Sequence, residues 1–126
     1  MARVVVCAVI RRGGKILAMR RKHASMNGKW EFPGGKLENG ESEQACLERE
    51  LSEELGIRGK TGAFLTESLY RYPFGEILLR AYEFDWQEGE IALRVHDRAE
   101  WVEPAALRTL DLSPADVPIA GFLANG

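Results

Sequence analysis

The sequence lacks several features that mark common classes of protein. It has 17 Lys and Arg against 19 Asp and Glu, a formal net charge of −2, so it has no basic surplus with which to hold a nucleic-acid backbone. No apolar run is long enough to span a membrane. The short apolar run at residues 4–10 is followed by an Arg-Arg pair without a small-residue cleavage site, which is not typical of a secretory signal. Neither nucleic-acid polymers nor membranes are therefore expected partners.

Cysteine and histidine are equally scarce. The two cysteines, Cys7 and Cys46, have no CxxC partner and no histidine at metal-ligand spacing. We expect them to be free thiols of a cytoplasmic protein. The two histidines, His23 and His96, are isolated in the sequence, and isolated histidines seldom act as acids or bases. Neither is placed in the catalytic set.

With 126 residues, the chain has the size of one ordinary domain, and 45% of its residues are hydrophobic, which is enough to form a buried core. We expect a single globular domain over residues 1–126. A short helical turn is predicted at residues 103–107, and Ser113 followed by Pro114 predicts the start of an apolar C-terminal helix. Runs of β-branched and aromatic residues between glycine turns predict two hairpins and one further strand. These strands are residues 4–10 with 16–19, residues 62–74 with 76–86, and residues 99–104.

Glutamate is abundant in one segment, with seven glutamates in residues 34–57. Three leucines recur there every four residues, which predicts a helix with one apolar stripe. The helix is expected to begin near Ser42 or Glu43 and to stop at Gly56. The leucines of the stripe are Leu47, Leu51 and Leu55.

Three of these glutamates, Glu50, Glu53 and Glu54, fall on one side of the predicted helix, about a quarter turn from the leucine stripe. Like charges three and four residues apart repel each other. A solvated acidic face is the ordinary explanation of such a pattern. The other explanation is a bound cation, and oxygen ligands without His or Cys suit Mg²⁺ or Mn²⁺ in a phosphate site.

The surrounding residues favour the second explanation. Gly35, Glu41 six residues later, and the run RELSEELGI from Arg49 to Ile57 fill every fixed position of a 23-residue pattern. This segment resembles the signature of the Nudix hydrolases. The resemblance implies an α/β protein with the Nudix fold, an α/β/α sandwich around a mixed β-sheet, and divalent-metal hydrolysis of a pyrophosphate bond.

The resemblance extends beyond that segment. MRRK, WEFPGGK and SPADVP occur in the order and approximate spacing of MutT-type nucleoside triphosphate pyrophosphohydrolases, and they are most similar to the branch that contains CTP pyrophosphohydrolases and 8-oxo-dGTP diphosphatases. By resemblance, Glu50, Glu53 and Glu54 are the catalytic metal ligands. Glu50 is also a candidate for orienting or deprotonating water, with the Gly34 carbonyl as a further ligand. Residues expected to support this loop and helix are Gly35, Glu41, Arg49 and Gly56.

The same resemblance suggests the substrate contacts. Arg21 matches a position that contacts phosphate, where a solvated strand-end charge is the alternative. Phe32 and Phe74 match positions around the base, where ordinary core packing is the alternative. Asp116 stands where MutT carries an asparagine that reads oxidised guanine. An ionised Asp116 could accept from cytosine N4 and a protonated one could also donate, unless it merely caps the last helix.

A fourth acidic metal ligand of MutT has no direct counterpart, because Val95 occupies that position by spacing. Asp97, two residues further on, could supply the carboxylate after a small change of register, or water could take its place. Asp97 is therefore included among the candidate metal ligands.

The resulting hypothesis is an Mg²⁺-dependent enzyme, with Mn²⁺ possible, that hydrolyses a nucleoside triphosphate to its monophosphate and pyrophosphate. A proline at position 73 resembles a marker of ADP-ribose hydrolases, which keeps nucleoside diphosphate derivatives as alternative substrates. A nucleotide-sensing domain without catalysis is the other alternative, although such domains often lose the glutamates that this chain retains. We expect a monomer or a homodimer with a small nucleotide substrate.

Overall fold

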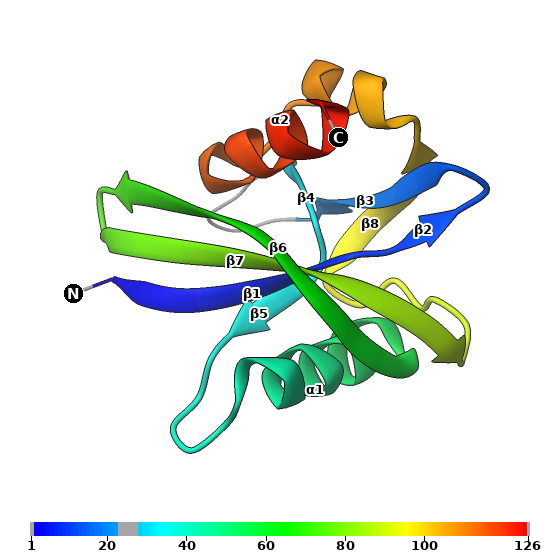
Figure 1. The fold of residues 1–126 in the computed structure, drawn as a ribbon, viewed down its shortest axis with the longest axis horizontal. Helices are drawn as coiled ribbons and strands as arrows, with labels where there is room; N and C mark the ends of the chain where they lie inside the picture. Colours follow the sequence, from blue (N-terminus) through cyan, green and yellow to red (C-terminus); the bar gives the residue numbers. More distant parts are fainter. Residues whose placement is uncertain (1, 23–27, 126) are drawn as a thin grey trace.

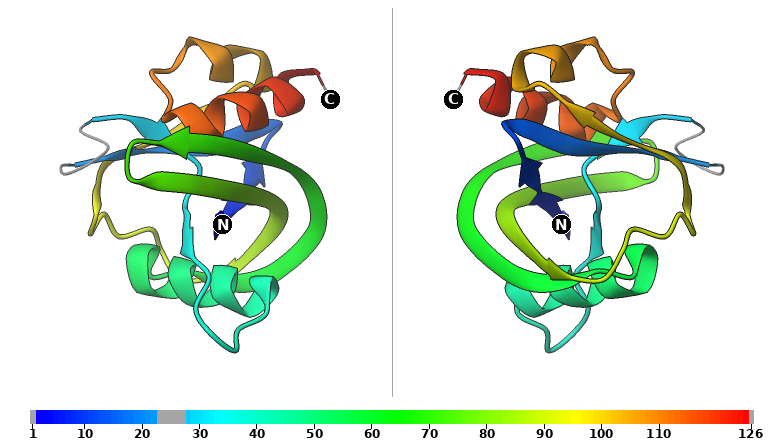
Figure 2. Two further views of the ribbon diagram at one scale, coloured as in Figure 1. Left: turned by 90° about the vertical axis from the view of Figure 1, so that its left-hand side faces the viewer. Right: turned by 90° about the vertical axis from the view of Figure 1, so that its right-hand side faces the viewer.

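Two β-sheets lie between the two α-helices of the protein (Figure 1). The computed structural model describes residues 2–22 and 28–125, so His23 lies outside the described residues. Helix α1 (Glu43–Leu55) covers one side and α2 (Val117–Asn125) the other (Figure 2). The remaining elements are β1 (Arg3–Val9), β2 (Arg11–Arg12), β3 (Lys15–Arg21), β4 (Trp30–Glu31), β5 (Gly34–Lys36), β6 (Arg58–Tyr72), β7 (Gly75–Glu88), β8 (His96–Val102) and the 3-10 turns η2 (Pro104–Thr109) and η3 (Pro114–Asp116).

The first sheet is mixed and has the strand order β5-β1-β7-β6. Its inner strand β1 runs parallel to β7 and antiparallel to β5, and β6 forms a long antiparallel hairpin with β7. Residues 6–9 of β1 are buried on both faces of the sheet, which is typical of an inner strand covered by helices. The expected α/β fold with a mixed sheet is confirmed, as is the hairpin around Gly75.

The second sheet is antiparallel and is centred on β3, which pairs with β2, β4 and β8. The predicted pairing of residues 4–10 with 16–19 is wrong. β1 belongs to the mixed sheet, and only Arg11 and Arg12, with one hydrogen bond from the Leu17 N–H to the Ile10 carbonyl, fold back on β3. A strand that is apolar on both faces is buried better between two helices than in an exposed hairpin. The strand expected at 99–104 begins at His96 and ends before Pro104, which starts a 3-10 turn.

Helix α1 has the bounds that its sequence predicts. The side chain of Ser42 accepts a hydrogen bond from the Ala45 N–H at 3.0 Å and caps the helix. Gly56 ends it with a φ of 75°, in the left-handed region that favours glycine. The leucine stripe is confirmed, because all three leucines are fully buried against the mixed sheet. The apolar stripe therefore fixes the direction in which the glutamates of α1 point.

Truncating this stripe should destabilise the protein. Leu51 has 0% of its surface exposed, and Leu51→Ala should lower the free energy of unfolding by about 2–5 kcal/mol through lost burial and a residual cavity. Urea denaturation followed by circular dichroism measures this difference. Leu69→Ala is the matched control, since Leu69 is 60% exposed and should change stability by less than about 0.5 kcal/mol. Equal effects of the two substitutions would contradict the assignment of the stripe.

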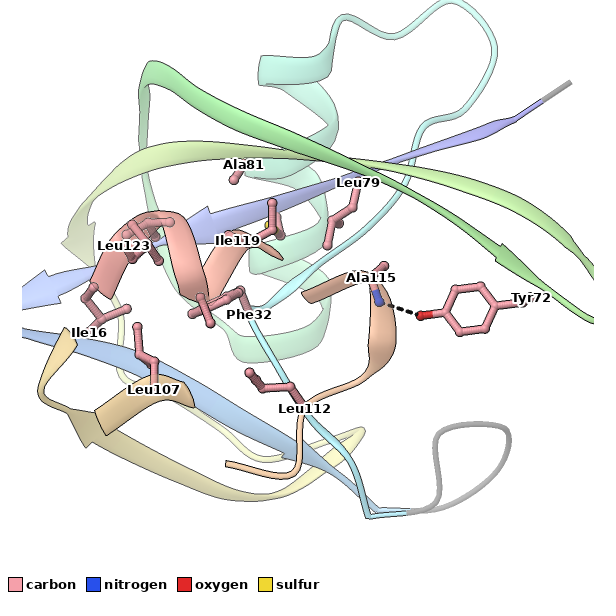
Figure 3. Packing of buried hydrophobic residues seen from close by; sticks show 13 residues of the cluster. Ile16, Phe32, Tyr72, Leu79, Ala81, Leu107, Leu112, Ala115, Ile119 and Leu123 are labelled. Atoms are coloured by element: carbon pink, nitrogen blue, oxygen red, sulfur yellow. Dashed lines mark hydrogen bonds between the residues drawn. The ribbon is translucent and has the colours of Figure 1, made fainter. Parts of the chain in front are cut away.

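Helix α2 and the 3-10 turns cover the opposite face of the mixed sheet (Figure 3). The predicted apolar C-terminal helix is confirmed, but Ser113 and Pro114 begin the turn η3, and α2 starts only at Val117. The Ser113 hydroxyl bonds the carboxyl of Asp116 at 3.1 Å instead of capping a helix amide. Among residues 2–22 and 28–125, no helix is long and apolar enough to cross a membrane.

Candidate active site

A cavity of about 810 Å³ is lined by residues from β1, β3, β4, β5, α1, the β6–β7 turn and η3. Its volume lies within the range of about 300–1,000 Å³ that small-molecule sites occupy. Carboxyl groups outnumber cationic groups in the lining, so a polyanionic ligand would need an added cation to bind there. The charged lining residues are Glu31, Glu38, Glu50, Glu54, Glu76 and Asp116, with Arg3, Arg21 and Lys36.

Two of the three predicted catalytic glutamates face this cavity. The side chains of Glu50 and Glu54 are 13% and 20% exposed and both line it. The side chain of Glu53 is 60% exposed and forms an ion pair with Arg49 at 3.0 Å. The structure thus brings Glu50 and Glu54 to one wall of the cavity, whereas Glu53 does not belong to the cavity lining.

The environment of these carboxyls suits a hard cation. Burial raises the pKa of Glu50 and of Glu54, and Oε1 of Glu54 is buried without a hydrogen-bond partner in residues 2–22 and 28–125. Its nearest cation is a guanidinium nitrogen of Arg21 at 3.8 Å. No three His, Cys, Asp or Glu side chains in the described ranges converge as a complete metal cage. Mg²⁺ requires no such cage, because it commonly takes one or two carboxylates and completes its shell with water and phosphate.

Arg49 holds the loop and helix of the signature together. Its Nε and Nη2 bind both oxygens of Glu41 at 2.6 and 3.0 Å, and this bidentate pairing lowers the pKa of Glu41 to about 2. Its Nη1 reaches Glu50 at 3.3 Å and Glu53 at 3.0 Å. Arg49 and Glu41 thus occupy the supporting positions that the resemblance implied, and Arg49 offsets part of the repulsion along α1.

The two glycines of β5 leave room for these groups. Gly34 pairs with Cys7 of β1, and a Cβ on Gly34 would overlap the Val6 carbonyl oxygen of that strand. A Cβ on Gly35 would instead overlap the carboxylate of Glu50. Because these two glycines have no side chain, β5 can pack closely against both β1 and α1.

Arg21 bridges the carboxylate wall to a group that the sequence did not reveal. Its Nη2 binds Oε2 of Glu31 at 2.7 Å, and His96, which is fully buried, contacts the same oxygen through Nε2 at 2.9 Å. Burial opposes ionisation of Glu31, yet hydrogen bonds from His96 and Arg21 lower its pKa. Glu31 lies within the WEFPGGK segment, whose alternation could have placed its side chain opposite that of Phe32.

Asp97 requires a correction. Its carboxylate binds the guanidinium of Arg20 at 2.8 and 3.0 Å. The pairing of β3 with β8 is irregular here, since Arg20 pairs with Arg98 and Arg21 with His96, which leaves Asp97 without a partner in the register. Arg21 lines the cavity and lies 3.8 Å from Glu54, whereas Arg20 and Asp97 do not belong to the cavity lining. The structure therefore directs Asp97 away from the other candidate metal ligands, and the residue that β8 turns toward the site is His96.

The far end of the cavity holds Phe32, Phe74 and Asp116. Phe74 is 67% exposed and stacks on Tyr72 with ring centroids 5.1 Å apart, so it is not a core residue, whereas Phe32 is buried in the core beside the cavity. Oδ1 of Asp116 accepts the Phe32 N–H at 3.0 Å, and no helix cap is formed by this carboxyl. Burial, together with the charge of Glu31, raises the pKa of Asp116 to about 8.

Fold and site together define the class of this protein. The sequence model of the NUDIX domain matches residues 1–123. The chain belongs to the Nudix family and is a Nudix hydrolase of the MutT type.

The similarity extends over most of the chain. It is 39% identical to the CTP pyrophosphohydrolase of Escherichia coli over 117 residues, covering 91% of this chain and 86% of the relative. It is 33% identical to the 8-oxo-dGTP diphosphatase of Escherichia coli, covering 85% of this chain and 83% of the relative. The solution structure of the Escherichia coli ORF135 protein superposes with a TM-score of 0.89 at 34% identity, covering 98% and 89% of the two chains. The resemblance derived from the motifs is confirmed.

Proposed function

We propose that the protein hydrolyses a nucleoside triphosphate to its monophosphate and pyrophosphate with Mg²⁺, for which Mn²⁺ can substitute. The observation that carries the proposal is the wall formed by Glu50, Glu54 and the β5 glycines beside a nucleotide-sized cavity. All its metal-binding atoms are oxygens, and one buried oxygen of Glu54 lacks a hydrogen-bond partner within the part of the chain that the structure describes, as suits a hard cation. The names of two relatives, CTP pyrophosphohydrolase and 8-oxo-dGTP diphosphatase, support a triphosphate substrate.

The residues of the wall have distinct proposed roles. Glu50, Glu53, Glu54 and the Gly34 carbonyl would hold the cation, which when bound neutralises phosphate charge. Glu50 orients the attacking water and accepts its proton, which its raised pKa favours. The water oxygen bonds to phosphorus, the bond to the bridging oxygen breaks, and monophosphate and pyrophosphate separate. Arg21 binds a phosphate oxygen through the guanidinium that it already presents to the cavity.

The base is proposed to lie between Phe74 and Asp116. A neutral carboxyl offers a donor beside an acceptor. Cytosine presents the complementary pattern, because its N3 accepts a hydrogen bond and its N4 amine donates one. In 8-oxoguanine, O6 accepts and the N7–H donates. A carboxyl with a pKa of about 8 is mostly neutral at pH 7. One residue can therefore serve both substrates after which the relatives are named.

The decisive experiment is a substrate panel with the purified protein and Mg²⁺, containing CTP, dCTP, 5-methyl-dCTP, dGTP, 8-oxo-dGTP, the other nucleoside triphosphates and ADP-ribose. Chromatography identifies the products. We expect monophosphate and pyrophosphate from one or a few triphosphates, and loss of both with EDTA. Hydrolysis of ADP-ribose alone would contradict the proposed substrate class, and binding without any hydrolysis would indicate a sensor.

Asp116→Asn tests whether this carboxyl selects the base. The amide oxygen should take the Phe32 N–H, leaving the NH₂ group to donate into the cavity at every pH. Because the amide keeps its donor where the wild-type carboxyl has ionised, we expect kcat/KM for both substrates to exceed the wild-type value by about tenfold near pH 9, the value of roughly one hydrogen bond. Steady-state kinetics of both substrates at pH 7 and pH 9 measures this difference, and metal dependence serves as the unchanged control. Equal kcat/KM of the variant and the wild type near pH 9 would remove Asp116 from base recognition.

The same variant should alter the dependence of activity and stability on pH. Burial raises the pKa of Asp116 from 3.8 to about 8, so the folded protein holds this proton more tightly than the unfolded chain. Its contribution to stability therefore declines as pH rises from about 4 to about 8. Wild-type kcat/KM should also fall as pH passes about 8, because the donor is lost. Both trends should be weaker in Asp116→Asn.

A further inference from the structure

A short chain of polar groups lies behind the proposed base site. The hydroxyl of Tyr72, a residue 9% exposed, accepts a hydrogen bond from the Ala115 N–H at 3.0 Å (Figure 3). The same hydroxyl lies 3.5 Å from Oγ of Ser113, and this Oγ donates to Oδ2 of Asp116 at 3.1 Å. The other oxygen of Asp116 accepts the Phe32 N–H at 3.0 Å.

The ionised carboxylate at one end fixes the direction of this chain. A carboxylate can only accept, so the Ser113 proton is directed to Asp116. The Ser113 oxygen then has no proton left for Tyr72, so the Tyr72 hydroxyl accepts from Ala115 and directs its own proton to Ser113. An ionised Asp116 consequently accepts two hydrogen bonds, one from a side chain and one from the backbone. Such bonds favour the charged form of a carboxyl.

The backbone holds this arrangement in place. The Ser113 N–H donates to the carbonyl of Trp30 at 2.9 Å, and Trp30 begins the segment that also supplies the Phe32 N–H. The loop carrying Ser113 and the strand facing Asp116 are therefore joined independently of the Ser113 hydroxyl. Removing that hydroxyl should change the hydrogen bonding of Asp116 with little movement of the backbone.

Other charged and titratable groups also act on Asp116. Glu31 of β4 disfavours its ionisation and Arg21 of β3 favours it. The buried thiol of Cys7 on β1 lies close enough for Asp116 to raise the pKa of the thiol. These three side chains and Tyr72 belong to four different strands, β1, β3, β4 and β6, and Ser113 provides the only side-chain hydrogen bond to Asp116 among the described residues.

We propose that Ser113 and Tyr72 are specificity-positioning residues that orient the Asp116 carboxyl and set the balance between its neutral and ionised forms. The inference rests on the proposed function, in which Asp116 faces the base. The neutral form pairs with an edge that has an acceptor beside a donor, whereas the ionised form accepts only. Ser113 acts directly on this balance, and Tyr72 acts through Ser113.

The test is a pH titration of the Asp116 carboxyl carbon by NMR in the ligand-free protein. Ser113→Ala should raise the titration midpoint by about one pH unit, because a donor to the charged form is lost. Ser113→Thr retains the hydroxyl and should restore the wild-type midpoint. Tyr72→Phe should raise it by less, since 3.5 Å is long for this contact. Tyr72→Phe should add no shift in the Ser113→Ala background.

The pH dependence of kcat/KM should shift together with the NMR midpoint of Asp116. For CTP or 8-oxo-dGTP, the pH at which kcat/KM falls should increase in Ser113→Ala by the same amount as the NMR midpoint. An unmoved midpoint in Ser113→Ala would overturn the proposal, as would a Tyr72→Phe shift that persists without the Ser113 hydroxyl. If Ser113→Ala fails to fold, the two other variants still test the proposal. A midpoint in Ser113→Thr that differs from the wild-type midpoint would overturn it. An unshifted midpoint in Tyr72→Phe would also overturn it. Because the NMR titration needs no substrate, its result stands apart from failure of the proposed hydrolysis.

Discussion

Glu54→Gln should reduce kcat by about 10³-fold or more, because it removes a charge from the proposed metal site while preserving shape. The buried Oε1 of Glu54 has no hydrogen-bond partner among the described residues, so an amide there replaces a cation-binding group with a weaker one. Affinity for Mn²⁺, measured by electron paramagnetic resonance, should weaken by at least about tenfold. Single-turnover assays with the best triphosphate measure the loss in rate.

The fold should survive this change. Burial raises the pKa of Glu54, so its ionisation at neutral pH opposes folding and the neutral amide removes that cost. The melting temperature should therefore equal or exceed that of the wild type. Glu88→Gln is the matched control, because the side chain of Glu88 is 67% exposed and pairs with Arg58 at the end of β7. Wild-type turnover in Glu54→Gln would refute its role as a ligand.

Gly35→Ala should have the second large effect, lowering kcat/KM by about 10²-fold through displacement of a catalytic group. The added Cβ would overlap the carboxylate of Glu50, which is the end of a side chain and can move away. The protein should therefore fold but hold Glu50 out of position. Steady-state kinetics and thermal unfolding of the same preparation separate the two effects.

Two other glycines supply controls for that result. Gly121→Ala places its Cβ in open space within α2 and should stabilise the protein by about 0.5–1 kcal/mol without altering kinetics. Gly34→Ala would overlap backbone of β1 and should impair folding itself. An active, wild-type-like Gly35→Ala protein would show that the position of Glu50 is not critical.

The helix of the signature could be predicted from the sequence because its information is local. Ser42, Gly56 and the leucine spacing determine where α1 begins, ends and docks, and the side of the helix that carries the glutamates follows from this. The pairing of β1 could not be predicted in the same way. Its apolar run is compatible with a hairpin and with an inner strand, and only the distant residues of β7 decide between them.

The same limit explains the missed site residues. Glu31 and His96 are 65 positions apart in the chain, and their contact depends on the pairing of β3 with both β4 and β8. Asp97 was the better candidate by residue type, but it lies at an irregularity of the β3–β8 pairing and binds Arg20, while His96 contacts Glu31. Ser113 had the features of a helix cap, but its hydroxyl donates to Asp116 three residues further on. The Phe32 N–H reaches the same carboxyl from 84 positions away, through the approach of the segment that follows β4. The chemical character of the site residues could therefore be predicted from the sequence, whereas the directions of their side chains could not.

Arg49 also affects the stability of the protein without a bound ion. Its guanidinium lies against Glu41, Glu50 and Glu53, so the acidic surface of α1 contains a permanent counter-ion of its own. Folding and loading with the proposed divalent ion should therefore be separable events, so that the chain folds first and acquires the ion later. A molecule stripped by a chelator should remain a folded reservoir of enzyme, restored by adding the ion back.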